Sequence, residues 1–415
     1  MRIPSLKLLI GWVLLYTVLI VYGYARFYRD PGSIFYDPDR AFVRQYTDFR
    51  LRQVAAFISA YDKDALRPVT KAGASPKICV HVTTVKRDGQ QYIDETIASV
   101  LEGLTSEERE DIYVSVFFAN TDPTIHPSYH NPWLRHVVDE VYSVPPDNGD
   151  LIHRLEGYED KGDYSAKGVV DYAYGLQHCY DKGMPFLLML EGDVIAADGW
   201  LVKTLEGLDR VQKILRKSPS DWIYLRLFNQ ERSTGWASHK VGANNELWIS
   251  LAIAAALLCF AAVLRRYARS STILTDNASL ALICALIIPS LVVGFFQAGK
   301  ANVLPPRPGV FEQNFGCCSQ ALLYPRRQVP RLTQYLQNTG KGQVDLMVNR
   351  HAASDHLSRF SLYPVQFQHV GIQSSRKTLV DEARSIWSMA FEDKNPVALE
   401  RDHQRLVEAI YHSKR

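Results

Sequence analysis

The 415-residue sequence has no large excess of either charge, with 47 lysine and arginine residues against 44 aspartate and glutamate residues. A near balance provides no broad positive field for phosphate backbones, so we expect no nucleic-acid partner. Internal repeats and low-complexity tracts are also absent from the sequence. The length alone allows two or three average domains, or one large α/β domain with additional segments.

Cysteine is scarce, with six residues, and no two have the C-x-x-C spacing that is typical of structural zinc sites. Cys259 and Cys284 lie within long apolar runs, where we expect them to act as small apolar residues. The remaining four lie in polar parts of the chain: Cys79, Cys179, Cys317 and Cys318. Four cysteines allow three disulfide pairings, and the sequence does not select one of them.

Long apolar runs are the first strong positive signal. Residues 8–24, 247–264 and 279–296 each form an uncharged run of about the length that spans a membrane. We interpret residues 8–24 as an uncleaved signal anchor, because the run is long for the apolar part of a signal peptide and ends in Tyr22 and Tyr24. A cleaved signal peptide is the alternative for this run, and a buried soluble hairpin is the alternative for the other two. The absence of charged residues from the runs argues against a transporter.

The charges that flank these runs predict a topology. Three arginines follow the second run, and basic residues in short loops stay on the cytosolic side. We therefore predict a cytosolic loop at residues 265–278 and a cytosolic tail at residues 1–7, with both large polar parts on the opposite, luminal side. The sequon at Asn277 falls in the predicted cytosolic loop, so we expect it to remain unglycosylated.

The polar parts alternate between strand-like and helix-like patterns. β-Branched and aromatic runs predict strands at residues 78–85, 112–122, 186–190 and 223–228, with helical patterns between them. This alternation predicts an α/β fold with a largely parallel sheet.

The polar segment after the third apolar run has too few predicted elements for an independent α/β domain. We therefore interpret residues 76–246 and 297–415 as two parts of a single luminal domain that a membrane hairpin interrupts. Residues 25–75, in which charged and aromatic residues alternate, are interpreted as a stem between the anchor and this domain.

The strand-like run FLLML is followed by Glu191, Gly192 and Asp193. Ligands of largely parallel sheets bind beyond the carboxyl ends of the strands, so we expect these acids at the ligand-binding edge, together with Asn120 and Asp122. An acid-x-acid motif there suits a hard divalent cation, although most such tripeptides are solvated turns. In a membrane-anchored luminal domain, a metal at this edge is what a nucleotide-sugar glycosyltransferase needs, because it neutralises the diphosphate leaving group.

A series of motifs surrounds this site in the sequence. They are HVTTVKR, KGVVDYAYGLQHC, FLLMLEGD, IYLRLFNQE, GCCSQALLYP, VDLMV and FQHVG, with the apolar hairpin inserted after the fourth. In these motifs and their order the chain resembles the Golgi post-GPI-attachment N-acetylgalactosamine transferase family, and more distantly the class IV branching N-acetylglucosaminyltransferases. The resemblance implies an A-type glycosyltransferase (Rossmann-like) fold that is split by a transmembrane hairpin. It also implies a multi-pass Golgi membrane protein with a luminal catalytic domain.

The same resemblance implies a donor site. Asp193 would coordinate a Mn²⁺ ion that bridges the diphosphate of a UDP-sugar, with His369 of FQHVG as the second protein ligand. Glu191 would lie near the nucleotide. Three residues at and after the end of the first strand would line the uridine and phosphate site: Thr83, Thr84 and Lys86. The implied donor is UDP-N-acetylgalactosamine (UDP-GalNAc).

The resemblance also implies the acceptor side. Asp345 of VDLMV would remove the proton from a hydroxyl of the acceptor, the mannose core of a GPI-anchored glycan, in an inverting displacement. The hairpin would hold the site near the bilayer, where a lipid-linked glycan lies. One departure bears on these roles, because the family pattern is Glu-Asp-Asp and this chain has Gly192 in the middle position. The missing carboxylate is the one expected to contact the donor ribose.

Structural roles are the alternative for each of these residues. They would then be a structural histidine (His369), a solvated helix carboxylate (Asp345), ordinary strand threonines (Thr83 and Thr84) and surface charges (Lys86 and Arg87). Lys167 and Asp171 are spaced for an i,i+4 ion pair on a helix, and we favour this role over contact with the donor.

Two other functions remain open at this point. An N-glycan-branching N-acetylglucosaminyltransferase would act on soluble glycoproteins, for which the hairpin has no evident purpose. A non-enzymatic membrane adaptor with a degenerate transferase domain would explain Gly192, but it would not explain the retention of Asp193, Asp345 and His369.

Overall fold

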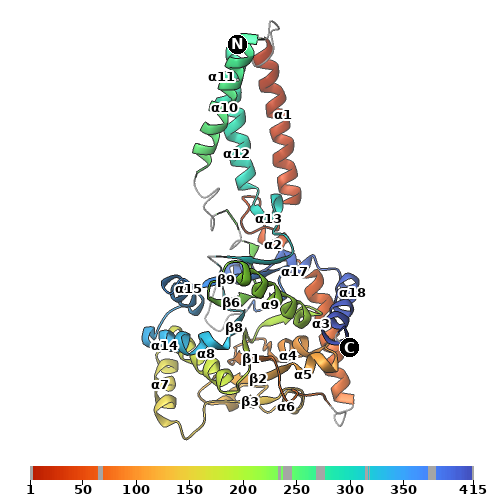
Figure 1. Ribbon diagram of the computed structural model, residues 1–415, viewed down its shortest axis with the longest axis vertical. Coiled ribbons are helices and arrows are strands. Elements are labelled where there is room, and N and C mark those ends of the chain that lie inside the picture. Colours follow the sequence, from red (N-terminus) through yellow and green to blue (C-terminus); the bar gives the residue numbers. More distant parts are fainter. Residues whose placement is uncertain are drawn as a thin grey trace. The chain divides into compact units, whose positions relative to one another are not determined.

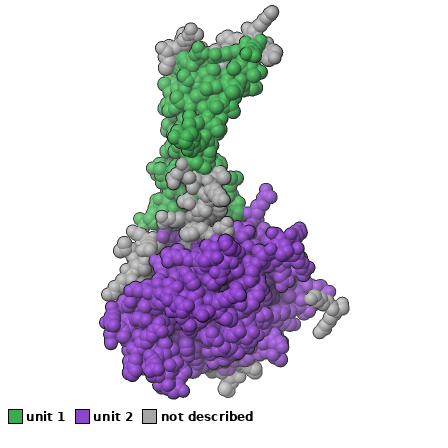
Figure 2. Space-filling model, turned by 60° about the vertical axis from the view of Figure 1, so that its left-hand side comes forward, with its two compact units in different colours: residues 1–42, 231–306 green, residues 43–230, 307–415 purple. Residues whose placement is uncertain are grey.

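The computed structural model describes residues 3–63, 69–231, 235–236, 245–267, 276–313, 316, 318–372 and 380–413. The chain divides into two compact units, which are coloured separately in Figure 2. Unit 1 comprises Met1–Phe42 and Glu231–Pro306, and unit 2 comprises Val43–Gln230 and Arg307–Arg415. Each unit is therefore built from two separate stretches of the chain.

Unit 1 contains three helices that are long and apolar enough to cross a membrane: Ser5–Arg26, Glu246–Arg266 and Asn277–Gln297. The first lies within α1 (Ile3–Arg26) and the second within α10 (Glu246–Tyr267). The third joins α11 (Asn277–Leu282), a π-helical turn at Ile283–Ile287 and α12 (Ile288–Gln297). The wide turn ends two residues before Pro289, which lacks an N–H group for regular helix bonding. The three apolar runs of the sequence therefore form helices that exceed their predicted bounds by a few residues.

A buried carboxylate connects the ends of two of these helices within unit 1. Asp30, just beyond α1, accepts hydrogen bonds from the backbone N–H groups of Gly32 (2.7 Å) and Ala301 (3.1 Å). Burial raises the pKa of Asp30 above its ordinary value. Gly299 follows α12 with φ of 88°, and a Cβ added there would overlap the Asp30 carboxylate. Asp30 thus fastens the end of α1 to the segment after α12, where α13 (Lys300–Val303) begins.

We predict that Asp30→Ala destabilises unit 1 by about 1–3 kcal/mol, because the buried N–H group of Ala301 loses its acceptor. Thermal unfolding of the full-length protein in detergent micelles measures this effect. Asp39→Ala, which removes an exposed carboxylate on α2 (Pro38–Ala41), is the matched control. Equal unfolding temperatures for the two variants would contradict the role given to Asp30.

Unit 2 is built around an eight-stranded sheet with the order β3-β2-β1-β4-β8-β6-β9-β7. The strands from the first stretch of chain are β1 (Ile78–Thr84), β2 (Ile112–Phe118), β3 (Glu140–Tyr142), β4 (Phe186–Glu191) and β6 (Trp222–Arg226). The second stretch supplies β7 (Gly309–Glu312), β8 (Ala321–Pro325) and β9 (Ser358–Tyr363). The four pairs β2–β3, β1–β2, β1–β4 and β6–β9 are parallel, whereas β8 is antiparallel to both β4 and β6. The predicted mixed α/β fold with a mostly parallel sheet is confirmed, and the four predicted strands are β1, β2, β4 and β6.

Helices cover both faces of this sheet (Figure 1). One face packs against α4 (Ile93–Leu101), α6 (Pro132–Val137) and α9 (Trp200–Lys217). The other face packs against α8 (Tyr164–Asp181), α14 (Val329–Thr339) and α15 (Val344–Ser354). Alternate residues of β1 serve the two faces, since Val80 and Val82 join the first cluster and Cys79 joins the second. The remaining helices of unit 2 are α3 (Gln45–Lys63), α5 (Ser106–Glu110), α7 (Gly149–Asp160), α16 (Val380–Ser385), α17 (Met389–Glu392) and α18 (Pro396–Val407).

Helix α3 is an integral part of unit 2, although the sequence suggested a stem for this region. The Arg50 side chain is fully buried and donates to the carbonyl oxygens of Ala196 and Ser99, each at 3.0 Å. At the start of the helix, Glu392 accepts from the backbone N–H groups of Tyr46 and Thr47, each at 3.0 Å. These contacts cap the helix and fix it against distant parts of the chain.

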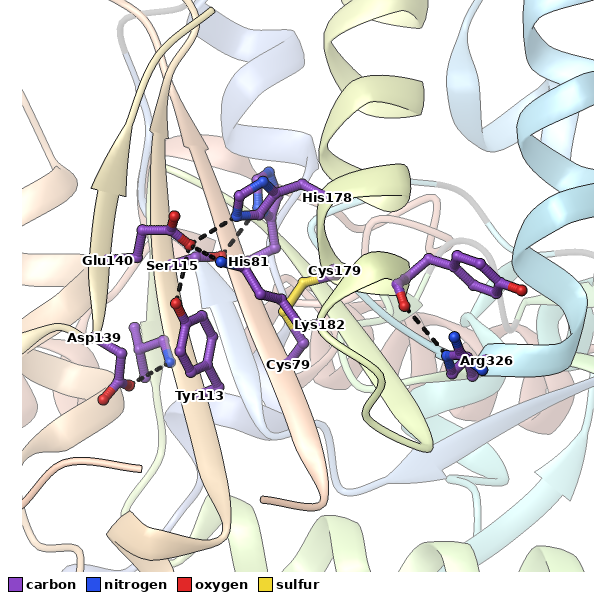
Figure 3. Close-up of a disulfide and its surroundings, with 12 residues drawn as sticks. Cys79, His81, Tyr113, Ser115, Asp139, Glu140, His178, Cys179, Lys182 and Arg326 are labelled. Carbon is purple, nitrogen blue, oxygen red and sulfur yellow. Dashed lines mark hydrogen bonds and ion pairs between the residues drawn. A yellow bond between two sulfur atoms is a disulfide. The ribbon is translucent and has the colours of Figure 1, made fainter. Parts of the chain in front are cut away.

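A disulfide between Cys79 and Cys179 joins β1 to α8 on the second face (Figure 3). Cys318 is also disulfide-bonded, whereas Cys317 lies outside the described residues. The first bridge therefore selects one of the three pairings that the sequence left open. Cys259 and Cys284 are free, as expected.

Beside this disulfide, Glu140 ties the edge strand β3 to α8 (Figure 3). Its Oε2 atom accepts from Tyr113 Oη at 3.0 Å, His178 Nε2 at 2.8 Å and Lys182 Nζ at 2.8 Å. A short edge strand has few ladder hydrogen bonds of its own, so these side-chain contacts hold it in place.

Candidate functional site

The carboxyl edge of the sheet gathers several residues that the sequence analysis selected. Strand β4 ends at Glu191, and the β1–β4 register places Thr83 directly beside it. The chain then passes through Gly192 and Asp193 into the short strand β5 (Val194–Ala196), which pairs with β10 (Phe367–His369). His369 is opposite Val194 in this pairing, so β10 brings it next to Asp193.

Asp193 is buried and faces two cationic side chains. Its Oδ2 atom lies 2.9 Å from Nη2 of Arg87 and 3.3 Å from Nε2 of His369. Burial acts to raise the pKa of Asp193, but the charges of His369 and Arg87 outweigh it and hold the pKa below its ordinary value. Burial acts to lower the pKa of His369, and the Asp193 charge raises it above its ordinary value. Asp193 is therefore a carboxylate at neutral pH.

The other oxygen of this carboxylate, Oδ1, is buried and has no hydrogen-bond partner among the described residues. An anionic oxygen in this state carries a desolvation cost that a bound cation would remove. His369 Nδ1 lies 3.2 Å from the carbonyl oxygen of Ile386 and must donate to it, which directs Nε2 toward Asp193. A carboxylate oxygen beside an oriented imidazole nitrogen is a donor set that fits a divalent transition metal.

Two glycines fit tightly around this carboxylate. A Cβ added at Gly371 would overlap Oδ2 of Asp193. A Cβ added at Gly192 would lie 2.9 Å from the carbonyl oxygen of Thr83 and 3.2 Å from Oγ1 of Thr84. The middle position of Glu-Gly-Asp thus faces the backbone of β1, and an aspartate there would force the end of that strand to move. This close approach is a packing reason for the departure from Glu-Asp-Asp.

The residues at and after the end of β1 have partners within the chain. Thr83 Oγ1 lies 3.0 Å from Nε2 of His81, and Thr84 Oγ1 lies 3.2 Å from Nε2 of His126. Lys86 has an exposed side chain, and its backbone N–H donates to Asn120 Oδ1 at 2.8 Å. The three residues predicted for uridine and phosphate therefore lie along one turn of chain at the sheet edge.

Glu191 and Asp345 are connected through adjacent residues. Ser319 Oγ donates to Oε1 of Glu191 at 2.7 Å, and the backbone N–H of Cys318 donates to Oδ2 of Asp345 at 2.7 Å. Burial raises the pKa of Tyr172, and the charges of both acids add to this shift. Asp345, in the first turn of α15, thus lies on the same side of the sheet edge as Glu191. No contact between Asp345 and Asp193 is found among the described residues.

Two arginines at this edge were not recognised as site residues from the sequence. The Arg87 side chain is only 13% exposed, so the interpretation of Arg87 as a surface charge is wrong. Arg226, at the end of β6, is buried and donates to the carbonyl oxygens of Gly316 (3.1 Å) and Cys318, which fixes the segment that contacts Glu191 and Asp345. The sequence could have indicated Arg226, because it is an arginine within the apolar run IYLRLF. A charge in a buried strand is costly unless other groups of the protein bind it, so such a residue is expected to have a specific role.

The pairing predicted for Lys167 and Asp171 is confirmed. Lys167 Nζ lies 2.8 Å from Oδ2 of Asp171 one helical turn later in α8. Lys167 also donates to the carbonyl oxygen of Ala119 at the end of β2. This ion pair therefore connects α8 to the sheet.

A second cluster, of Asp198, Glu400 and His403, has spacing that could hold a metal. His403 Nε2 lies 2.8 Å from Glu108 Oε2, and His403 Nδ1 lies 3.2 Å from Asp198 Oδ1. Burial acts to lower the pKa of His403, but hydrogen bonds to Asp198 and Glu108 raise it to about 10. Both ring nitrogens then carry protons at neutral pH, so a metal would have to displace one of these protons and break a carboxylate contact. The cluster instead fastens α18 to α5 and to the turn before α9.

We predict that His403→Gln destabilises unit 2 at pH 6 by roughly 2 kcal/mol, and that this difference shrinks as the pH rises toward 10. The protonated ring contributes its full stabilisation below the pKa of an unfolded histidine, about 6.5. This contribution decreases as the pH rises and is lost once the pH passes the raised pKa of the folded state. Thermal unfolding at several pH values measures the difference between wild type and variant. His153→Gln, which removes an exposed histidine of α7, is the control. A pH-independent difference would show that the protonated ring is not the source of the stability.

We predict that Gly371→Ala destabilises unit 2 by about 3 kcal/mol, because the added methyl group displaces the buried Asp193 carboxylate from its two cations. Gly157→Ala in α7 is the matched control, since nothing lies within 4 Å of its added Cβ. The control is expected to be neutral or slightly stabilising, as helix propensity favours alanine. Chemical denaturation of both variants compares them, and equal stability would refute the close packing described for Gly371.

Comparisons with known proteins agree with the motifs. A family model described as GPI-N-acetylgalactosamine transferase PGAP4 matches residues 78–368, which run from the start of β1 into β10. Curated relatives are more distant. Alpha-1,3-mannosyl-glycoprotein 4-beta-N-acetylglucosaminyltransferase B of Mus musculus is 22% identical over 177 residues, which are 39% of this chain and 31% of the relative. Alpha-1,3-mannosyl-glycoprotein 4-beta-N-acetylglucosaminyltransferase A of Macaca fascicularis is 24% identical over 178 residues, which are 40% of this chain and 32% of the relative.

The A enzyme of Bos taurus is 22% identical over 216 residues, 48% of this chain and 39% of the relative. The matched part thus spans about a third of the length of these curated relatives. The family match is broader, because it includes the described strands β1 to β9 in full and ends at residue 368 within β10, one residue before His369. The resemblance drawn from the motifs is confirmed, and the chain belongs to the GPI-N-acetylgalactosamine transferase PGAP4 family.

Proposed function

We propose that the protein is a metal-dependent glycosyltransferase that transfers N-acetylgalactosamine from UDP-GalNAc to the mannose core of GPI anchors. Family membership supports the reaction and the class of acceptor. The observation that carries the proposal is the pair formed by Asp193 and His369 at the carboxyl edge, where the buried Oδ1 atom of Asp193 has no donor in the part of the chain that the structure describes. A nucleotide-sugar transferase uses such a position to hold the cation that accompanies the donor diphosphate.

On the donor side, Asp193 Oδ1 and His369 Nε2 would hold Mn²⁺, which supplies Lewis-acid stabilisation of the diphosphate leaving group when bound. Thr83 and Glu191 are adjacent across β1 and β4 and would face the nucleotide. Thr84 and Lys86 would extend this surface toward the phosphates. The mostly parallel sheet, with an acidic motif after β4 and the small β5–β10 sheet beside it, supports an A-type glycosyltransferase fold.

On the acceptor side, Asp345 would act as the general base. The Cys318 N–H donates to one of its oxygens, which holds the carboxylate in a fixed orientation. The proton of a mannose hydroxyl passes to Asp345 as the hydroxyl oxygen bonds to the anomeric carbon. The bond between that carbon and the diphosphate oxygen breaks, and UDP leaves with the electron pair. The product has an inverted anomeric configuration.

The proposed setting is the Golgi membrane, with unit 2 in the lumen. Residues 230 and 307 belong to the same unit, so the chain between them must cross a membrane an even number of times. The two candidate spans at Glu246–Arg266 and Asn277–Gln297 satisfy this condition. The arginines that follow the first of these spans favour a cytosolic connection between them.

The two other functions have weaker support. The branching N-acetylglucosaminyltransferases match less than half of this chain, whereas the PGAP4 family model matches most of it. The non-enzymatic adaptor depended on Gly192. Its close approach to Thr83 and Thr84 gives that residue a packing role that does not require loss of activity.

We predict that Asp193→Asn lowers transfer of N-acetylgalactosamine to a GPI-glycan acceptor by about 100-fold or more, because the charge that would hold the cation is lost. Asp209→Asn is the matched control, since Asp209 is an exposed carboxylate paired with Lys213 on α9. Activity of purified full-length protein is measured with UDP-GalNAc, with and without Mn²⁺. Wild-type activity of Asp193→Asn would contradict the metal assignment.

A cellular measurement tests the substrate class independently of the metal. Mass spectrometry of GPI glycans from cells with and without the protein should reveal loss of a hexosamine on the mannose core. Unchanged GPI glycans together with altered N-glycan branching would favour the second function, and no change in either would favour the adaptor.

A further inference from the structure

Arg87 is held firmly against the buried carboxylate of Asp193. It lies on the loop between β1 and α4, and its Nη2 atom is 2.9 Å from Asp193 Oδ2. Gln91 fixes the backbone of this loop, because its amide accepts from the Arg87 N–H at 3.2 Å and donates to the Arg87 carbonyl oxygen at 2.8 Å. The guanidinium carbon lies 5.2 Å from the centre of the Tyr92 ring. Specific contacts with Asp193, Gln91 and Tyr92 therefore fix the position of Arg87.

The charge of Arg87 also reaches the residues at the end of β1. Burial, and after it the Arg87 charge, lowers the pKa of His126 to about 4. His126 Nε2 lies 3.2 Å from Oγ1 of Thr84. Arg87 therefore contacts the acid motif directly, and it follows within three residues the strand end that we propose for the donor phosphates.

The two oxygens of Asp193 are in unequal surroundings. Oδ2 faces Arg87 and His369, whereas Oδ1 is buried and receives no hydrogen bond from any described residue. A divalent cation at Oδ1 would meet a carboxylate whose charge Arg87 already neutralises in part. Two positive charges within a few ångströms in a buried place repel each other. Cation binding and the Arg87–Asp193 ion pair therefore oppose each other.

The geometry points to Arg87 as a donor-binding residue that competes with the divalent cation for Asp193 and moves to the donor diphosphate when both are present. This inference rests on the proposed function. A guanidinium group matches phosphate oxygens through a planar pair of N–H donors. The diphosphate would give Arg87 a new partner as it leaves Asp193. The cation and the nucleoside diphosphate should therefore bind cooperatively, each strengthening the affinity for the other.

The test measures Mn²⁺ binding to purified full-length protein by the electron paramagnetic resonance of free Mn²⁺, with and without UDP. The variant is Arg87→Gln, which keeps a long polar side chain and removes the charge. Without UDP, it should bind Mn²⁺ about tenfold more tightly than wild type, because no guanidinium competes. With saturating Mn²⁺, it should bind UDP about tenfold more weakly, so that the cooperativity disappears.

Arg327→Gln is the matched control. Arg327 Nη2 forms an ion pair with Asp221 Oδ1 at 2.6 Å, just before β6 and thus at the amino edge of that strand. It should bind Mn²⁺ and UDP as wild type does. Circular dichroism and thermal unfolding of each variant establish that it is folded, and Asp193→Asn serves as the variant expected to lose Mn²⁺ binding.

The outcomes separate the inference from the proposed function. If Arg87→Gln binds Mn²⁺ no more tightly than wild type, while Asp193→Asn loses it, Arg87 does not compete and only the inference fails. If Arg87→Gln keeps the wild-type cooperativity between Mn²⁺ and UDP, the inference fails and the proposed function is unaffected. If wild type binds no Mn²⁺ even with UDP, the inference and the metal assignment of the proposed function both fail.

Discussion

The burial of one negative charge, that of Asp193, determines much of the architecture at the carboxyl edge of unit 2. A carboxylate removed from water must face positive charge, and two distant segments supply it: the loop after β1 with Arg87 and strand β10 with His369. The small β5–β10 sheet brings His369 of β10 next to Asp193, because His369 pairs with Val194 in β5. Gly371 is needed at the next turn because any side chain there would occupy the space of the carboxylate. The two cationic side chains, the β5–β10 pairing and the glycine at position 371 thus all serve to accommodate the Asp193 carboxylate.

The sequence predicted the elements whose signal is local. Strands β1, β2, β4 and β6 are dense in β-branched and apolar residues and could be recognised individually. The region of helix α3 also has a helical pattern, but its place within the folded domain could not be recognised, since its exposed charged face resembles a solvated stem. What makes it part of the fold is the burial of Arg50 against Ala196 and the cap from Glu392, which come from residues far along the chain. Contacts of this range leave no periodic pattern in the sequence.

The same distinction applies to the site. The rule that ligands bind beyond strand ends was enough to select Glu191 and Asp193, and the β1–β4 register then explains why Thr83 joins them. His369 and Asp345 were selected only through the family resemblance, because nothing in their neighbours indicates a site. Arg87 was misread because a basic residue in a loop ordinarily points to water. Gly192 looked like a missing carboxylate until the backbone of Thr83 was seen to lie against it.

The place of β8 in the sheet has a consequence for biosynthesis. This strand lies between β4 and β6, yet it follows both candidate hairpin helices in the chain. As the polypeptide emerges from the ribosome, β1, β2 and β4 are synthesised long before β8. The edge of β4 that later pairs with β8 therefore has unpaired backbone N–H and C=O groups until β8 is made. The two candidate spans at Glu246–Arg266 and Asn277–Gln297 are therefore made before that gap can be filled. The order of segments in the chain therefore sets the timing of folding, and a delay between the synthesis of β4 and that of β8 would leave an aggregation-prone strand edge exposed.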